Sequence, residues 1–581
     1  MSPTKAQSIL LRLLVLCCLL VIPASVQAGN GTQATFTVNT TTMLNDLHLG
    51  DNICADSNGQ CGLFAAVQES NYDDDTDIIN LPAGVFYIPS RLELVKPVRI
   101  TGSGSAQTQT VINGFSAGTE PAFRIRANAT IENLAIVGFN QAVVINSAES
   151  SKTLYLQGVR VENCGNELAE VGPAITNTCA SCAIHISESS EIRNNHSDSC
   201  GAITNIGTLT ISSSTVSANT SSVSYGGAIC SSGVGNTLSI NNSLIHSNSA
   251  DNVDNGYGGA LFLDDGTFTI TSSEFFNNSS GKGGGAINLR GGTLSITLSK
   301  VYDNLANYGG GLALSGDSAE IVNSLIMDNQ AEGYGGGLYI LKGASITNSS
   351  VINNTAGTAG GAVAISDEML TITNSTVSGN KASVDGGGFY LSNTAVIRLA
   401  NATLTDNTAD FDLDDEILGM GGGFYTTGNS KVISRNSVIA GNKDLKAVPF
   451  EVVATDCYGK LESDGYNLLG YAGGFCTLSG NLQGMQYGTA GVLLDPKLGP
   501  LTLYADNTQY YHPLFWGPAV DAGNPAGCRD FTNVLLTSDQ LQENPRPYSG
   551  GSATGYTPCC DLGAIESTIA RRNLFLPLAI R

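Results

Sequence analysis

Basic side chains are scarce in this sequence of 581 residues. Lysine and arginine number 27 against 50 aspartates and glutamates, which gives a formal net charge of −23. Nucleic acids are bound by clustered lysine and arginine, so this charge balance predicts no nucleic-acid partner. Charged residues make up only 13% of the chain and apolar residues 42%, the reverse of the balance in disordered proteins. The chain is therefore expected to fold, with its acidity serving solubility.

Long apolar runs are missing after the first 28 residues. Lys5 and Arg12 precede an apolar run from Leu13 to Ile22, and a stretch of small residues ends at Ala28. This pattern predicts a signal peptide at residues 1–28. The run is too short to span a bilayer, which takes about 20 apolar residues. The mature chain is thus predicted to be exported and to have no transmembrane segment.

The sequence has no recognisable catalytic motif. Its five histidines are scattered, and no serine or cysteine nucleophile motif or glycine-rich phosphate loop is present. Asp264-Asp265 is the best carboxylate pair, and Asp317, Asp367 and Glu368 lie in comparable turns. Paired carboxylates can hydrolyse a glycosidic bond, whereas isolated acids in turns are commonly solvated. We predict no catalytic residues and leave enzymatic activity uncertain.

Cysteine is missing from the middle of the chain. Twelve cysteines follow residue 28, and all lie before residue 231 or after residue 456. An even number in an exported chain predicts disulfides, and stapling helps most at the ends that cap a repeat. The predicted pairs are Cys54 with Cys61 and Cys457 with Cys476. Cys179-x-x-Cys182 has two other interpretations, a redox pair or half of a zinc site.

The middle of the chain has a repeat instead. A glycine, a small residue and an apolar residue recur nine times, with the apolar residue at 203, 229, 261, 287, 312, 338, 363, 389 and 424, and six of the eight intervals are 25 or 26 residues. Within each unit apolar residues alternate with polar ones, as in short strands: Leu338 and Ile340, then Ala344 and Ile346. Strands this short bury a face only when copies stack. The predicted fold class is all-β, a right-handed parallel β-helix with three-strand coils of about 25 residues and caps at both ends.

An asparagine follows the third predicted strand of each coil. These residues are Asn219, Asn248, Asn278, Asn304, Asn329, Asn354, Asn380, Asn407 and Asn442. An asparagine at a corner can hydrogen-bond the next coil, and it tolerates a left-handed backbone. We predict a structural ladder, represented by Asn304, Asn329, Asn354 and Asn380, with a ligand groove as the alternative.

Two coils are lengthened just after this asparagine, between Asn248 and Leu261 and between Asn407 and Phe424. Insertions on one face of a solenoid often mark a binding edge. The second insertion holds four aspartates whose oxygens suit calcium: Asp410, Asp412, Asp414 and Asp415. We predict no cofactor other than calcium at this candidate site, with a solvated acidic loop as the alternative.

Four tyrosines stand directly before the glycines of their coils: Tyr225, Tyr257, Tyr308 and Tyr334. We predict that they stack at one corner and have one of two roles. They form an exposed aromatic stripe that binds sugar rings or a protein partner, or they simply pack between neighbouring coils.

Three segments resemble known families. Cys61-Gly62-Leu63-Phe64-Ala65-Ala66-Val67 with Leu81-Pro82-Ala83-Gly84 resembles the N-terminal module of CSLREA-domain proteins. The glycine signature with Phe275-Phe276-Asn277-Asn278 resembles the polymorphic outer-membrane-protein repeat. Pro518-Ala519-Val520-Asp521-Ala522-Gly523, Arg546-Pro547 and Cys560-Asp561-Leu562-Gly563-Ala564-Ile565-Glu566 resemble the choice-of-anchor Q domain. The predicted division is a CSLREA-like cap at 29–80, the β-helix at 81–450, an anchor-like cap at 451–566 and a tail at 567–581.

The resemblance implies a protein that is secreted or attached to the cell surface, in the outer membrane if the source has one. We expect a role in adhesion or envelope structure without catalysis, and a cell-surface polysaccharide or protein as partner. The alternative is a polysaccharide-active enzyme, a lyase or glycoside hydrolase, on the same scaffold. The tail is predicted to be either a last strand or a sorting signal.

Overall fold

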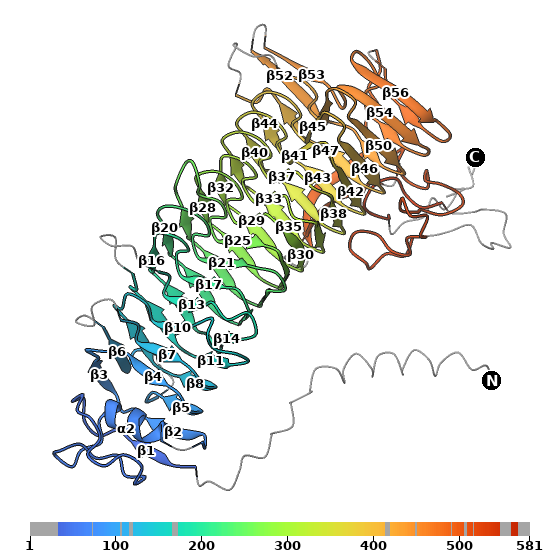
Figure 1. The fold of residues 1–581 in the computed structure, drawn as a ribbon. Coiled ribbons are helices and arrows are strands. Elements are labelled where there is room, and N and C mark those ends of the chain that lie inside the picture. Colours follow the sequence, from blue (N-terminus) through green and yellow to red (C-terminus); the bar gives the residue numbers. More distant parts are fainter. Residues whose placement is uncertain are drawn as a thin grey trace, which may run out of the picture.

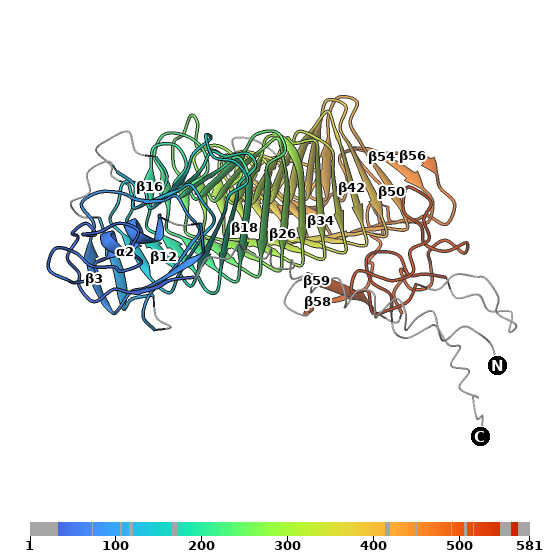
Figure 2. The same cartoon turned by 60° about the horizontal axis from the view of Figure 1, so that its bottom comes forward.

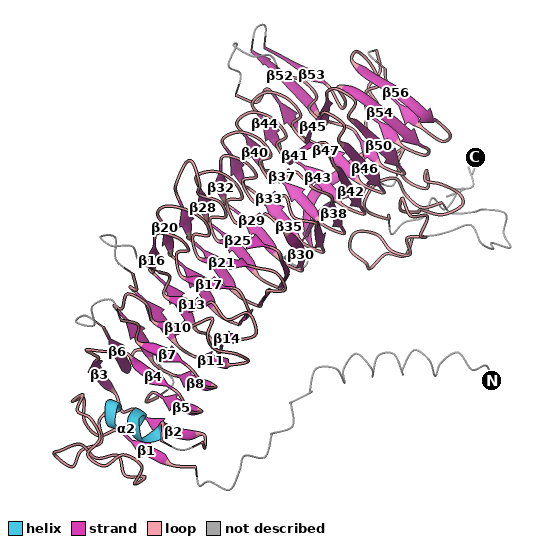
Figure 3. Cartoon of the chain, in the orientation of Figure 1, coloured by secondary structure: helices cyan, strands magenta, loops and turns pink. Residues whose placement is uncertain are grey.

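Short strands of successive coils stack in parallel into one elongated solenoid (Figure 1). The computed structural model describes residues 33–567 apart from 73, 105–106, 115–119, 166–171, 413–418, 448–449, 490, 505–507, 515 and 547–558. The predicted signal peptide and nearly all of the predicted tail lie outside the described residues. Within the described part, helix is limited to α2 (Leu63–Ser70) (Figure 3). The prediction of an all-β parallel solenoid is confirmed.

One coil shows the plan. β33 (Leu312–Leu314) is followed by β34 (Ser318–Val322), β35 (Leu325–Met327) and β36 (Gln330–Ala331). The chain then returns to β37 (Leu338–Ile340), which pairs in parallel with β33. The coil has four strands where the sequence predicted three, because a two-residue strand forms between the ladder asparagine and the glycines. Alternation of apolar and polar residues is not recognisable over two residues, so this strand could not be predicted from the pattern.

Strands at equivalent places in the coils form four sheets of 17, 16, 13 and 11 strands, here named A, B, C and D. Sheet A runs from β1 (Thr35–Thr37) to β56 (Cys476–Asn481), and sheet B from β3 (Gly84–Tyr87) to β57 (Gln486–Tyr487). Sheet C runs from β4 (Leu92–Leu94) to β49 (Phe424–Thr426). Sheet D runs from β16 (His196–Ser197) to the antiparallel hairpin of β52 (Lys443–Ala447) and β53 (Phe450–Ala454).

Inward side chains form continuous stacks through the core. Ile321, Ile346, Ile372 and Leu399 are register partners in sheet A, and each is 1% exposed or less. Burying an aliphatic side chain of this size stabilises the fold by about 1.5–3 kcal/mol. Each coil therefore depends on its neighbours for the burial that stabilises it.

The predicted asparagines form one hydrogen-bonded ladder inside the corner between sheets B and D. Asn329 is typical: its Nδ2 donates to Oδ1 of Asn354 at 2.9 Å and to the Val301 carbonyl at 2.9 Å. Its own Oδ1 accepts from the backbone N–H of Asn304 at 3.2 Å and from the Asn304 Nδ2 at 2.9 Å. The side chains are buried, so the ladder satisfies corner groups that water does not reach.

The left-handed backbone lies one residue earlier than the ladder asparagine. Positive φ values of 53° and 52° belong to Asp303 and Asp328, which precede Asn304 and Asn329. The expectation that the ladder asparagine itself takes this conformation was therefore wrong. The asparagine is selected by its amide hydrogen bonds, whereas the residue before it has to tolerate the left-handed turn.

A second ladder, of serines, was not predicted. Ser324 Oγ accepts from the backbone N–H of Ser299 at 3.1 Å, and Ser349 Oγ does the same for Ser324 at 3.1 Å. This ladder occupies the corner between sheets A and B, again one residue after a left-handed position. The recurring Asn-Ser pairs at 323–324, 348–349, 374–375 and 436–437 were the available signal.

The asparagine ladder ends on a carboxylate. Oδ1 of Asp456 accepts from both the backbone N–H and the Nδ2 of Asn442, each at 2.9 Å. Burial raises the pKa of Asp456 to about 7. In the unfolded chain an aspartate has a pKa of about 3.9.

This difference predicts a pH-dependent stability. The folded chain binds the Asp456 proton more tightly than the unfolded chain, so this group's stabilisation is full below about pH 4 and is lost as pH rises through about 7. We expect the melting temperature to fall between pH 5 and pH 8, and to fall less in Asp456→Asn, which keeps the acceptor and loses the charge. Calorimetry of both proteins across this range checks it. Parallel curves for the two proteins would contradict it.

The two ends of the solenoid differ. At the N-terminal end, α2 covers the first coils with Leu63, Ala66 and Val67, all 3% exposed or less. At the other end the coils continue past residue 450 through β54 (Gly459–Asp464), β55 (Leu468–Leu469), β56 and β57. Beyond β57 the described chain turns back instead of closing this end (Figure 1).

The returning segment, the described part of residues 495–567, is named the C-terminal arm. Its hairpin of β58 (Leu498–Tyr504) and β59 (Thr508–Pro513) lies along the flank of the solenoid (Figure 2). The Ser350 hydroxyl donates to the Gln509 carbonyl at 2.6 Å, and Thr376 donates to Oε1 of Gln540 at 2.6 Å. In the described residues, the predicted C-terminal cap therefore includes a segment that packs along the side of the solenoid and braces it.

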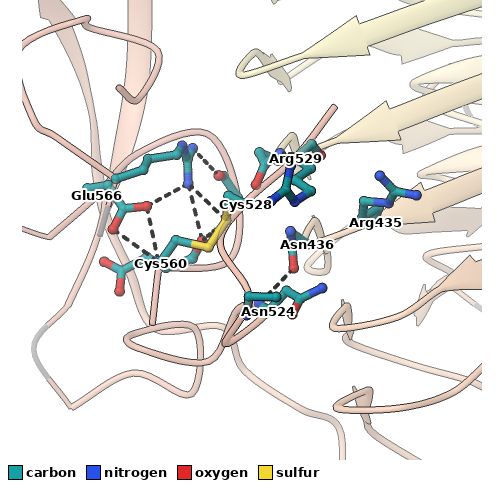
Figure 4. The surroundings of a disulfide bond; sticks show 12 residues. Arg435, Asn436, Asn524, Cys528, Arg529, Cys560 and Glu566 are labelled. Atoms are coloured by element: carbon teal, nitrogen blue, oxygen red, sulfur yellow. Dashed lines mark hydrogen bonds and ion pairs between the residues drawn. A yellow bond between two sulfur atoms is a disulfide. The ribbon is translucent and has the colours of Figure 1, made fainter. Parts of the chain in front are cut away.

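The arm follows a row of asparagines at the corner between sheets A and B. Gln542 donates to Asn323 at 2.6 Å, Asn374 donates to the Ser538 carbonyl at 2.9 Å, and Asn436 accepts from the Asn524 N–H at 3.0 Å (Figure 4). The row consists of Asn323, Asn348, Asn374, Asn401 and Asn436, all with φ between 47° and 53°. The matching corner of the preceding coils has Ser213, Asn242, Ser272 and Leu298.

The structure joins Cys54 to Cys61 and Cys457 to Cys476, the two predicted pairs. It also joins Cys179 to Cys182, where the sequence left a redox or zinc interpretation open. The remaining bridges are Cys200–Cys230 and Cys528–Cys560. The last one lies in the arm beside the buried ion pair of Arg546 with Glu566, 2.6 Å apart (Figure 4).

Candidate binding groove

The outer face of sheet C alternates large and small side chains. The middle residues of its strands point outward, and register pairs them in the order Phe262, Asn288, Ala313, Tyr339, Ala364, Tyr390 and Tyr425. The strands concerned are β25 (Leu261–Asp264), β29 (Ile287–Leu289), β33, β37, β41 (Val363–Ser366), β45 (Phe389–Ser392) and β49. The alanines leave room beside the rings, so the face is hollowed.

The predicted corner tyrosines lie along this face. The rings of Tyr308 and Tyr334 are stacked 6.2 Å apart, Tyr308 lies 5.3 Å from Tyr339, and Tyr334 lies 5.8 Å from Tyr390. These half-buried rings continue through Tyr425 and Tyr458 to Phe475, with centroid distances of 5.8, 4.7 and 5.0 Å. This set from Tyr308 to Phe475 is named the aromatic row.

Sequence reasoning found the corner tyrosines and missed those on the sheet. Tyr339, Tyr390 and Tyr425 each follow directly after the apolar residue of the glycine signature. In a strand, consecutive side chains point to opposite faces. The residue after a core position therefore faces outward, and three aromatic residues there were the signal.

Two hollows adjoin along this face. One, of about 500 Å³, is lined by residues that include Tyr257, Phe262, Arg290, Tyr308 and Tyr339. The next, of about 330 Å³, shares Tyr308 and Tyr339 and extends past Tyr334 to Tyr390 and Ser392. Together they make one groove along the solenoid axis. The first predicted insertion borders it through Asn255.

Few charges face this groove. The Arg290 guanidinium pairs with Asp264 and lies 5.2 Å from the centre of the Phe262 ring, and the Lys282 ammonium lies 5.5 Å from the Tyr257 ring. Burial raises the pKa values of Tyr339 and Tyr390, so both phenols stay neutral hydrogen-bond donors at physiological pH.

One carboxyl group lies beside the aromatic row. Asp385 accepts a hydrogen bond from the backbone N–H of Met420, in the second predicted insertion, at 3.1 Å. Burial raises the pKa of Asp385 to about 6, and its charge in turn helps to raise the pKa values of Tyr390 and Tyr425. A carboxyl whose pKa is raised in this way beside a row of aromatic rings is a candidate functional group.

Two of the carboxylates singled out from sequence, Asp264 and Asp367, have side-chain partners. Asp264 is bound by Arg290, and Asp265 takes a left-handed turn conformation with φ 56°. Asp367 accepts from Asn393 at 2.8 Å and from Ser366 at 3.0 Å, and these hydrogen bonds lower its pKa. Both Asp264 and Asp367 thus stabilise the turns in which they lie.

The calcium candidate is described only in part. Asp410 is buried with a left-handed φ of 54°, and Asp412 is exposed. Asp414 and Asp415 lie outside the described residues. Calcium at these four aspartates stays a prediction.

Known proteins resemble parts of this architecture. Residues 272–290 match the model of the Chlamydia polymorphic membrane protein repeat, and no curated protein sequence matches. Among solved structures, a thermostable GH87 alpha-1,3-glucanase from Streptomyces thermodiastaticus is 12% identical with a TM-score of 0.35, covering 70% of each chain. A PL6 alginate lyase is 11% identical with a TM-score of 0.25, covering 83% of this chain and 91% of the lyase.

The repeat match spans most of one coil, from the end of β26 (Gly266–Thr271) to β29, and includes Phe275 and the glycines before Ile287. The CSLREA and choice-of-anchor resemblances of the flanking segments stay predictions. No helix within the described ranges is long and apolar enough to cross a membrane. The chain is a parallel β-solenoid in which one coil matches the polymorphic membrane protein repeat.

Proposed function

We propose that this protein is an exported, surface-associated solenoid that binds an extended polysaccharide in the groove of sheet C and serves adhesion or envelope structure without catalysis. The observation that carries the proposal is the aromatic row and its two adjoining hollows. Export is supported by the N-terminal signal pattern and by disulfides, which persist in oxidising compartments. The repeat match and its membrane-protein description favour a surface location.

A polysaccharide suits this groove for three physical reasons. Tyrosine rings bury the apolar faces of sugar rings, while their hydroxyls hydrogen-bond sugar hydroxyls. The groove follows the axis, so its ring positions are separated by multiples of the coil spacing of about 4.8 Å, which is close to the length of one sugar residue. The few charges beside it are paired or lie on aromatic rings, which favours a neutral polymer over a strongly acidic one.

The test is affinity electrophoresis of the mature protein through gels containing neutral or acidic polysaccharides, with product analysis of the same mixtures. We expect retardation by at least one neutral polysaccharide and no new reducing ends or unsaturated products. Unaltered mobility in every gel would refute polysaccharide binding.

The second candidate function, a polysaccharide-active enzyme, is favoured by Asp385 alone. A carboxyl with a pKa of about 6 can donate a proton near neutral pH. Product formation that disappears in Asp385→Asn, while binding persists, would establish the enzyme and overturn the non-catalytic proposal.

A further inference from the structure

The C-terminal end of the solenoid presents an unprotected strand. β56 pairs with β54 over six residues, and no other described strand pairs with its second side. Natural edge strands are blunted by charge, proline or a bulge. β56 has the sequence Cys-Thr-Leu-Ser-Gly-Asn and none of these devices.

The apolar core is open at the same end. Cys476, Leu478 and Met485 pack on the main core cluster but are only partly buried. Phe475, Leu482 and Tyr487 around them are 65%, 48% and 52% exposed. The other end has α2 over its core, whereas no helix among the described residues covers this end. An exposed apolar surface of this kind marks an interaction site.

The hydrogen-bonding side of β56 can be assigned. The Gly459 N–H donates to the Phe475 carbonyl at 2.9 Å. In a parallel ladder, successive residues direct their backbone groups to opposite sides. Thr477 and Ser479 therefore bond to β54, and the backbone groups of Leu478 and Gly480 face outward.

We propose that two copies of this chain join end to end, with β56 of one copy antiparallel to β56 of the other about a twofold axis through Leu478. This register places Leu478 opposite Leu478 and Gly480 opposite Cys476, so outward backbone groups meet outward groups and core-facing side chains meet core-facing side chains. A twofold axis makes the contact self-complementary and closed.

A second copy fits better than a charged partner. Residues 465–494 contain no charged side chain, so a chain of net charge −23 can approach its own copy here without local repulsion. The inference goes beyond the proposed function and does not depend on it.

The first experiment is light scattering on the mature full-length protein over a concentration series. We expect a dimer that becomes a monomer in Leu478→Lys, which places two ammonium groups on the axis. Thr371→Lys, a half-exposed position in the middle of sheet A, is the matched control and should remain a dimer. A monomeric wild-type protein, or a dimer unchanged by Leu478→Lys, would overturn the proposal.

Cross-linking tests the register without altering the core. Thr477 of one copy lies opposite Ser479 of the other at a non-hydrogen-bonded position, where Cα atoms are about 4.5 Å apart and a disulfide can form. We expect a disulfide-linked dimer on mixing Thr477→Cys with Ser479→Cys, and none with either alone. A wild-type monomer that dimerises only after residues 571–581 are deleted would show that the chain's own tail occupies the edge.

Discussion

Replacing Asn329 with leucine is expected to lower the free energy of unfolding by about 3–6 kcal/mol. The change removes the acceptor of the Asn304 N–H and side-chain amide and the donor to the Val301 carbonyl. Asn329 is 1% exposed, so water cannot replace these partners. Three buried groups would lose a partner at about 1–2 kcal/mol each.

Chemical denaturation followed by circular dichroism measures this loss. Gln330→Leu is the matched control, because Gln330 is the next residue, lies in β36 and is exposed. Its unfolding free energy should change by about 0.5 kcal/mol or less. Equal free energies of unfolding for the two variants would mean that the hydrogen bonds of the ladder do not contribute to stability.

Removing two rings from the groove is expected to weaken polysaccharide binding by about 10- to 100-fold. Tyr308 and Tyr339 line both hollows, so the double variant Tyr308→Ala and Tyr339→Ala interrupts the groove at its centre. Loss of about 0.7–1.4 kcal/mol per stacked ring gives this range, since 1.4 kcal/mol corresponds to a factor of ten.

Affinity electrophoresis with the polysaccharide that retards the wild-type protein measures the effect. Tyr155→Ala is the control, because Tyr155 stacks 4.9 Å from His185 on sheet A, away from the groove. Retained affinity in the groove variant, or an equal loss in Tyr155→Ala, would place the polysaccharide elsewhere on the surface.

The repeat could be predicted from the sequence because its determinants are local and periodic. The asparagine of each coil bonds the asparagine of the next, so a spacing of 25 or 26 residues signals the contact directly. Half of the groove could be predicted from the sequence. The corner tyrosines stand directly before the glycine signature and are found with it, whereas the outward position of Tyr339 and Tyr390 follows only from the inside–outside alternation of side chains in a strand.

The arm could not be predicted in the same way. Ser350 and Gln540 are 190 residues apart and in contact at 2.9 Å, and no period connects them. Such a contact depends on the three-dimensional path of the chain after the last coil. A partial local trace of the arm is the unbroken row of asparagines at the corner that it follows, although Asn133 and Asn242 stand at the same corner of earlier coils.

The arm also fixes how the solenoid can change in length. Its contacts with Asn323, Asn374 and Asn436 lie on every second coil, so one coil added or lost between them would shift every later contact by one step. No hydrogen bond between described residues joins the arm to the coils before β29, and a whole unit of 25 or 26 residues could be duplicated or deleted there with the stacking intact. Natural variation in coil number should therefore be confined to the N-terminal half, and the groove should lengthen or shorten from that side only.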